Sequence, residues 1–169
     1  MHVGQILLVE AESHAEAEDK VRSAVQYSDN PNPDWSDWNE IGGRWSDFFG
    51  KGKNVLRYTE NTALAETKLG EWIACRHTEI KRYHSEVEKF NLAEVVANYD
   101  AEADWRNSFG ETSMNLWRLS KLAKLLSDDW TPDSAVFDLE NYTGNLKSFR
   151  ERVAVAPEMQ YLVIVDFHF

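Results

Sequence analysis

Three tryptophans, a glycine pair and an arginine are close together early in the sequence. Trp35, Trp38 and Trp45 fall within eleven positions, and Gly42-Gly43-Arg44 directly precedes the last of them. An indole is a large flat surface with one N–H donor, and glycine lets a backbone approach a ligand closely. A guanidinium suits phosphate or carboxylate. We therefore expect a pocket for a nucleotide-like or phosphorylated ligand, whose binding residues are Trp35, Trp38, Gly42, Gly43, Arg44 and Trp45.

A structural interpretation of the same segment stays open. The tryptophans can instead fill a seam between a hairpin and a helical layer, with the glycine pair forming a bulge and Arg44 pairing with an acid. The segment is not a phosphate loop, because it has neither the Gly-Lys-Ser/Thr ending nor the Gly-x-Gly-x-x-Gly spacing.

Asp166 and His168 are the second candidate pair. They are two positions apart in an apolar run, so on a strand both side chains point to the face that carries Leu162 and Ile164. A carboxylate beside an imidazole can orient it for general acid–base catalysis, which makes His168 and Asp166 the predicted catalytic residues. The alternative is a solvated pair at an open strand end. No third ligand is singled out, so neither a metal nor a cofactor is expected.

The segment Trp-x-x-Trp-x-x-Ile-Gly-Gly-Arg-Trp (35–45), together with Val-Asp-x-His (165–168), resembles a loose group of uncharacterised proteins from bacteria and their phages. The resemblance covers about fifteen residues at two ends of the chain and implies no activity. It implies that the two segments meet in space and form one site. If the chain is phage-encoded, we expect a counter-defence protein that acts in the cytoplasm of the bacterial host cell.

Hydrophobic periodicity and turn residues predict an α+β protein. Ser13 and Glu16 form a capping box that opens the first helix, and Gly50 to Lys53 is expected to turn a hairpin between 44–49 and 54–58. Strands are expected at 5–11, 134–139 and 161–169, and helices from 13, at 61–90, 92–99, 113–126 and 146–153. We expect one domain, 1–169, with a ferredoxin-like-type antiparallel or mixed sheet and a helical insertion at about 61–127.

Composition narrows the function classes. The formal net charge of −11 argues against direct binding of nucleic acid or anionic membranes, and no apolar run is long enough for a membrane helix. The single cysteine, Cys75, excludes an internal disulfide and fits a reducing cytoplasm. We expect its thiol to be buried.

Two functions from different classes follow. In the first, the chain sequesters or turns over a nucleotide-like molecule, with His168 as acid–base and Arg44 as anion clamp. In the second, it is an acidic inhibitor without catalysis, which imitates nucleic acid or blocks a basic host protein that handles nucleic acid. The acidic clusters 10–19, 94–104 and 128–140 would form that surface.

Overall fold

The computed structural model describes residues 2–25, 38–97, 111–128 and 135–168. Its elements in chain order are β1 (His2–Glu10), α1 (His14–Val25), β2 (Trp38–Ile41), a 3-10 turn (Gly43–Trp45), β3 (Val55–Arg57), α2 (Thr62–Val87), α3 (Leu92–Ala97), α4 (Glu111–Leu126), β4 (Val136–Asp138), α5 (Lys147–Val155), a second 3-10 turn (Pro157–Met159) and β5 (Gln160–His168). None of the described helices is both long and apolar enough to cross a membrane.

The five strands form one mixed sheet. Its order is β2-β5-β1-β4, and β3 pairs with β5 beyond the end of β2. Strands β1 and β4 are parallel, whereas β5 is antiparallel to β1, β2 and β3. The α+β class, with a mixed sheet and helices inserted between strands, is therefore confirmed.

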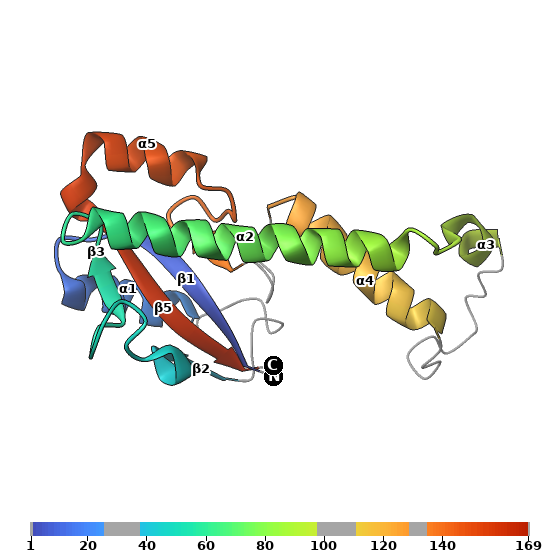
Figure 1. Ribbon diagram of the computed structural model, residues 1–169, viewed down its shortest axis with the longest axis horizontal. Coiled ribbons are helices and arrows are strands. Elements are labelled where there is room, and N and C mark those ends of the chain that lie inside the picture. The colour runs from blue at the N-terminus through green and yellow to red at the C-terminus, as the bar shows by residue number, and fades with distance from the viewer. Residues whose placement is uncertain (1, 26–37, 98–110, 129–134, 169) are drawn as a thin grey trace.

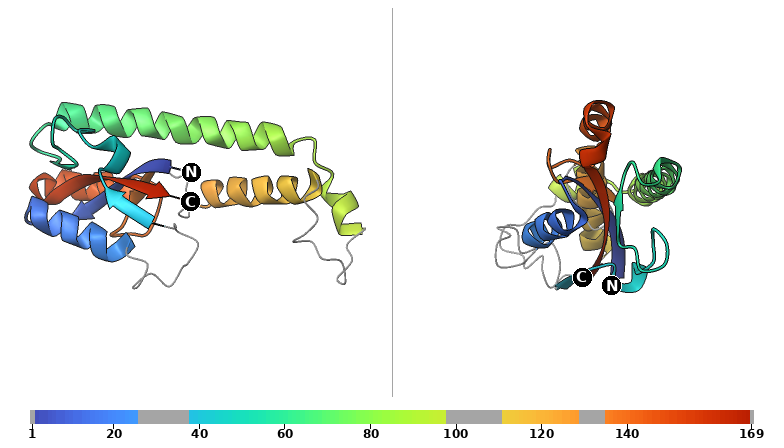
Figure 2. Two further views of the ribbon diagram at one scale, coloured as in Figure 1. Left: turned by 90° about the horizontal axis from the view of Figure 1, so that it is seen from below. Right: turned by 90° about the vertical axis from the view of Figure 1, so that its left-hand side faces the viewer.

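Both faces of the sheet are covered, because alternate side chains of β1 and β5 point to opposite sides. Leu7 and Val163 pack with α1, while Ile6 and Ile164 pack with α2 and α5. In the right-hand view of Figure 2, α1 and α2 stand on opposite sides of the sheet, and α5 lies above it. One bond of the predicted capping box is present at the start of α1, where Ser13 Oγ accepts from the backbone N–H of Glu16. The Glu16 carboxylate accepts from the backbone N–H of Glu12 instead of from that of Ser13.

Helix α2 belongs to two parts of the molecule. It begins beside the sheet, at the cap formed by Asn61, and continues far beyond it, where α4 returns antiparallel alongside (Figure 1). We call the distal part of α2 (residues 76–87), α3 and α4 the arm. A small apolar cluster of Tyr83, Leu122 and Leu125 joins the two long helices there.

The predicted hairpin between 44–49 and 54–58 is wrong. The chain turns immediately after β2, since Gly42 and Gly43 have φ values of 80° and 49°, and Gly43–Trp45 then forms the 3-10 turn. Residues 50–53 do form a turn, closed by a hydrogen bond from the Phe49 N–H to the Lys53 carbonyl. Strand β3 pairs with the long strand β5 instead of with the preceding segment.

The expected burial of Cys75 is also wrong. Its side chain is exposed on α2, and the neighbouring Arg76 is the residue that points inward, with only 11% of its side chain exposed. The Arg76 guanidinium donates to the backbone carbonyls of Gly144 and Leu125 and forms an ion pair with Asp128. One side chain thereby ties α2 to the end of α4 and to the loop before α5.

Replacing Arg76 by methionine should lower the free energy of unfolding by about 2–4 kcal/mol, because two carbonyls and a carboxylate lose a largely buried donor. Urea denaturation measures this loss. Arg82→Met on the same helix is the matched control: Arg82 is half exposed and pairs with Glu79, so its loss should cost less than about 1 kcal/mol. Equal costs for the two variants would contradict the role given to Arg76.

A second polar group ties the residue that follows β3 to α2 and α5. Glu66 on α2 accepts hydrogen bonds from the Tyr58 hydroxyl and from both terminal nitrogens of Arg150. The bonds from Arg150, reinforced by the Tyr58 bond and by the charge of Arg150, hold the pKa of Glu66 below its usual value of 4.5 against the opposing effect of burial.

The lowered pKa of Glu66 makes part of the stability depend on pH. The contribution is fully present above about pH 4.5, the value in the unfolded chain, and is lost as the pH falls through the lower folded value. Urea denaturation between pH 6 and pH 3 should therefore show a smaller loss of stability on acidification in Glu66→Gln than in the unchanged protein. Identical pH profiles would exclude Glu66 as a source of acid sensitivity.

Candidate functional site

Three strands place aromatic and acidic side chains at one end of the sheet. Trp38 on β2 lies opposite His168 on β5, and His2 on β1 lies opposite His168 from the other side. The expectation that the Trp-rich segment and the C-terminal strand meet in space is thus confirmed. We call His2, Trp38, Asp166 and His168 the sheet-end cluster; it lies beside the N and C labels of Figure 1.

Asp166 is the buried centre of the cluster. Its side chain is only 1% exposed, and its two carboxylate oxygens lie 3.1 and 3.2 Å from His2 Nδ1. Oδ2 also accepts a hydrogen bond of 3.1 Å from the backbone N–H of Arg44. Because a buried carboxylate needs donors, the Nδ1 of His2 carries the proton in this arrangement. The Nε2 of His2 is the ring nitrogen that this contact leaves available.

Trp38 and His168 form a stacked pair. Their ring planes are 8° apart and their centroids 5.5 Å apart. His2 meets both rings edge-on, with centroid distances of 4.9 Å to His168 and 5.3 Å to Trp38. Trp38 is 43% exposed, so the cluster presents a flat aromatic surface at the end of the sheet.

The glycine pair allows close packing against Asp166 and Asn54. A Cβ atom on Gly43 would lie 2.5 Å from the Cβ of Asp166, and one on Gly42 would lie 2.4 Å from Asn54 Nδ2. The backbone at the glycine pair was expected to approach a ligand closely. In the structure it approaches the side chains of Asp166 and Asn54. The Arg44 side chain that follows is exposed and forms no hydrogen bond or ion pair with another described residue, so the suggested pairing with an acid is not seen in this part of the chain.

An aromatic-walled cavity of about 290 Å³ adjoins the cluster and shares His2 with it. Trp45 and Trp72 close over Gly4, where a Cβ atom would lie 2.7 Å from ring atoms of both indoles. The two indoles also pack against the apolar cluster under α2, so they combine a core role with a wall of the cavity. The lining consists of His2, Val3, Gly4, Trp45, Trp72, Cys75, Glu79 and Ala135.

The structure places most of the predicted site residues together. Gly43 and the backbone of Arg44 lie against Asp166, Gly42 precedes them in the same turn, Trp38 and His168 stack on each other beside His2, and Trp45 lines the adjoining cavity. Trp35 lies outside the described residues. Asp166 and His168 point to the same face, as expected, but within the described ranges Asp166 bonds to His2 and to the Arg44 backbone instead of to His168.

Sequence reasoning missed His2, and also missed Trp72 as a wall of the cavity. The signal for His2 is the pairing of β1 with β5, because antiparallel pairing of Ile6 with Ile164 sets residue 2 opposite residue 168. That signal needs knowledge of which strands are neighbours. No group of three or more His, Cys, Asp or Glu side chains that could hold a metal ion occurs within the described residues.

Comparisons of the chain with protein-family models, with curated proteins and with solved structures found no match.

Gly43→Ala should be far more destabilising than Gly52→Ala. Both glycines have a positive φ, 49° and 70°, but a Cβ on Gly52 meets nothing within 4 Å whereas one on Gly43 meets Asp166. Backbone strain alone should cost about 1–2 kcal/mol, and displacement of Asp166 should add about 1–3 kcal/mol. Chemical denaturation measures both losses, and a shift of the His2 ring resonances only in Gly43→Ala would locate the damage. Equal costs would mean that the Gly43 contact with Asp166 is unimportant.

Proposed function

We propose that the chain binds a small ligand with a planar ring and an anionic group, of the nucleotide class, at this end of the sheet. The observation that carries the proposal is the position of His2. Its ring is held by the buried carboxylate of Asp166 and stands between the stacked Trp38–His168 pair and the Trp-walled cavity.

The cavity suits the ring of such a ligand. Its volume of about 290 Å³ is at the lower end of the range for small-molecule pockets. Flat indole walls favour a planar heteroaromatic group by stacking and by burial of apolar surface. His2 and Glu79, which also line it, supply the few polar groups that fix the orientation of a bound base.

Arg44 is the residue assigned to the anionic group. The backbone N–H of Arg44 donates to Asp166, and Asp166 also contacts His2, which lines the cavity. The Arg44 side chain therefore branches from the backbone close to the cavity. A guanidinium without a partner among the described residues keeps its donors for phosphate, and two of them can bind two oxygens at once.

We assign the proposed acid–base role to His2 instead of to His168. Asp166 fixes Nδ1 of His2, so Nε2 is the atom that can accept a proton from a ligand or give one to it. His168, stacked on Trp38, then contributes to the surface on which the ligand lies. Binding alone would sequester the ligand, and turnover would require this proton transfer.

The test is a titration of the purified protein with AMP, ADP, cyclic AMP and ADP-ribose, followed by indole fluorescence and by melting temperature. Binding to the native state should raise the melting temperature and change the emission of the indoles at the site. Arg44→Gln should lower the affinity for the phosphorylated ligands about tenfold or more, the usual effect of losing a charge-assisted hydrogen bond. The affinity for adenosine, which has no phosphate, should not change.

A pair of tryptophan variants provides the control. Trp38→Phe removes an indole from the cluster, whereas Trp117→Phe removes an exposed indole from the arm. Only the first should reduce the fluorescence response to ligand. The proposal fails if no compound in the panel changes either signal, or if Arg44→Gln binds all of them as well as the unchanged protein does.

The alternative of an acidic interaction surface has less support. In the cluster 128–140, Asp128 is bonded to Arg76, and Asp138 is fully buried in a double hydrogen bond with Arg152. Much of the cluster 94–104 lies outside the described residues. Reversal of charges in the cluster 10–19 would test what is left of this surface.

A further inference from the structure

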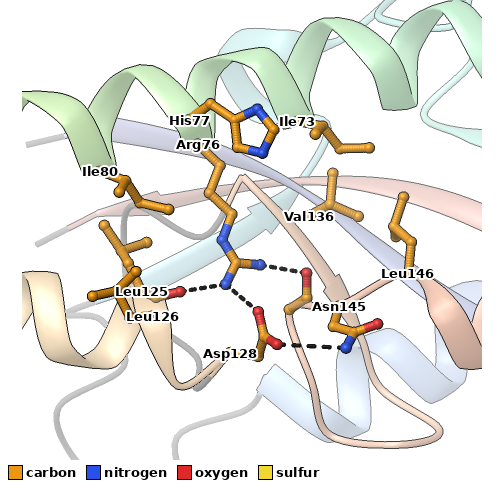
Figure 3. Close-up of a pocket in the computed structure, with 11 residues that line it drawn as sticks. Ile73, Arg76, His77, Ile80, Leu125, Leu126, Asp128, Val136, Asn145 and Leu146 are labelled. Atoms are coloured by element: carbon orange, nitrogen blue, oxygen red, sulfur yellow. Dashed lines mark hydrogen bonds and ion pairs between the residues drawn. The ribbon is translucent and has the colours of Figure 1, made fainter.

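We propose that a second pocket, where the arm joins the sheet, binds an aliphatic carboxylate. The pocket has a volume of about 370 Å³ and lies between α2, the end of α4, the start of β4 and the loop before α5 (Figure 3). It shares no lining residue with the aromatic-walled cavity. The inference is therefore independent of the proposed nucleotide site.

The apolar part of this pocket is aliphatic throughout. No aromatic ring apart from the imidazole of His77 lines it, in contrast to the tryptophan walls of the other cavity. Branched aliphatic walls fit an alkyl group, which gains from burial in proportion to its apolar area. Leu126 at the edge is 63% exposed, so an occupant would also cover an apolar side chain of the protein. The aliphatic residues are Ile73, Ile80, Leu125, Leu126, Val136 and Leu146.

The polar part of the pocket has spare donors and few spare acceptors. The guanidinium of Arg76 has five N–H groups, and its bonds to Gly144, Leu125 and Asp128 use three of them. His77 also lines the pocket and forms no hydrogen bond or ion pair with another described residue. Figure 3 shows the Arg76 side chain extending down from α2 between the aliphatic residues, with the His77 ring beside the helix above it.

The acceptors in the pocket are already engaged. One carboxylate oxygen of Asp128 accepts from Arg76 and the other from the Asn145 amide, at 3.4 Å. A ligand that completes this arrangement must bring acceptors to Arg76 and His77 and an alkyl group to the aliphatic wall. A carboxylate on a short aliphatic chain has both properties, and its oxygens can accept from the Arg76 N–H groups that Asp128 and the two carbonyls leave unused.

The experiment uses the full chain with octanoate, hexanoate and octan-1-ol as probes. Binding is followed by melting temperature and by NMR shifts of the methyl groups of Ile73, Ile80 and Val136. Octanoate should raise the melting temperature and shift these methyl signals saturably. Hexanoate, which buries less apolar area, and octan-1-ol, which lacks the charge, should both bind more weakly.

Arg76 is unsuitable as the main variant, because its loss should destabilise the fold. His77→Glu is better: His77 is exposed, and a carboxylate at that position repels the ligand's own. His77→Glu should lower the affinity for octanoate about tenfold or more. His84→Glu is the matched control, since it makes the same change on an exposed face of α2 away from the pocket and should leave octanoate binding unchanged.

Three results would overturn the proposal. The first is that neither octanoate nor hexanoate binds saturably. The second is octan-1-ol binding as tightly as octanoate, which would make the pocket a merely apolar surface. The third is evidence that the acid binds elsewhere, given either by equal octanoate affinity in His77→Glu and His84→Glu or by methyl shifts at Val3 instead of at Ile73 and Val136.

Discussion

The antiparallel pairing of β1 with β5 is the interaction on which the rest of the structure depends. It runs over nine residue pairs, from His2 opposite His168 to Glu10 opposite Gln160. Because side chains alternate between faces, this single register decides which residues meet α1 and which meet α2. It also places the only described histidine of β1 beside Asp166. A slip by one residue would exchange the two apolar faces and separate the imidazole from its carboxylate.

Asp166 converts this pairing into a local site. A carboxylate so deeply buried must be given hydrogen-bond donors, and the chain supplies them from β1, through His2, and from the turn after β2, through the backbone of Arg44. The absence of a side chain at Gly43 is what allows the turn to come so near. The backbone of Arg44 is therefore part of the structure around Asp166, whereas its side chain is exposed.

Local patterns in the sequence predict the elements well and their long-range pairing poorly. The spacing of Leu69, Ile73, Ile80 and Tyr83 predicts α2 almost to its ends, and the apolar run after Tyr161 predicts a buried strand. The hairpin prediction fails because β3 pairs with β5, which is distant in the sequence. His2 was missed because its position also depends on a distant pairing, that of β1 with β5. The candidate site was predictable as two segments of suitable chemistry. Its third segment, β1, follows only from strand order, which arises from packing across the whole sheet.

The continuity of α2 has a consequence for how the molecule opens. At 1.5 Å per residue its 26 residues span about 39 Å. The apolar clusters that hold its two halves differ greatly in size: a large cluster lies between α2 and the sheet, whereas only three buried residues form the cluster in the arm. Regions with few buried contacts unfold locally at low cost. Local unfolding that begins at the end of the arm distant from the sheet would stop at Arg76, because its hydrogen bonds hold α2 to α4 and to the loop before α5. Amide hydrogens on the two sides of Arg76 would then exchange with solvent on separate timescales, although they belong to one continuous helix.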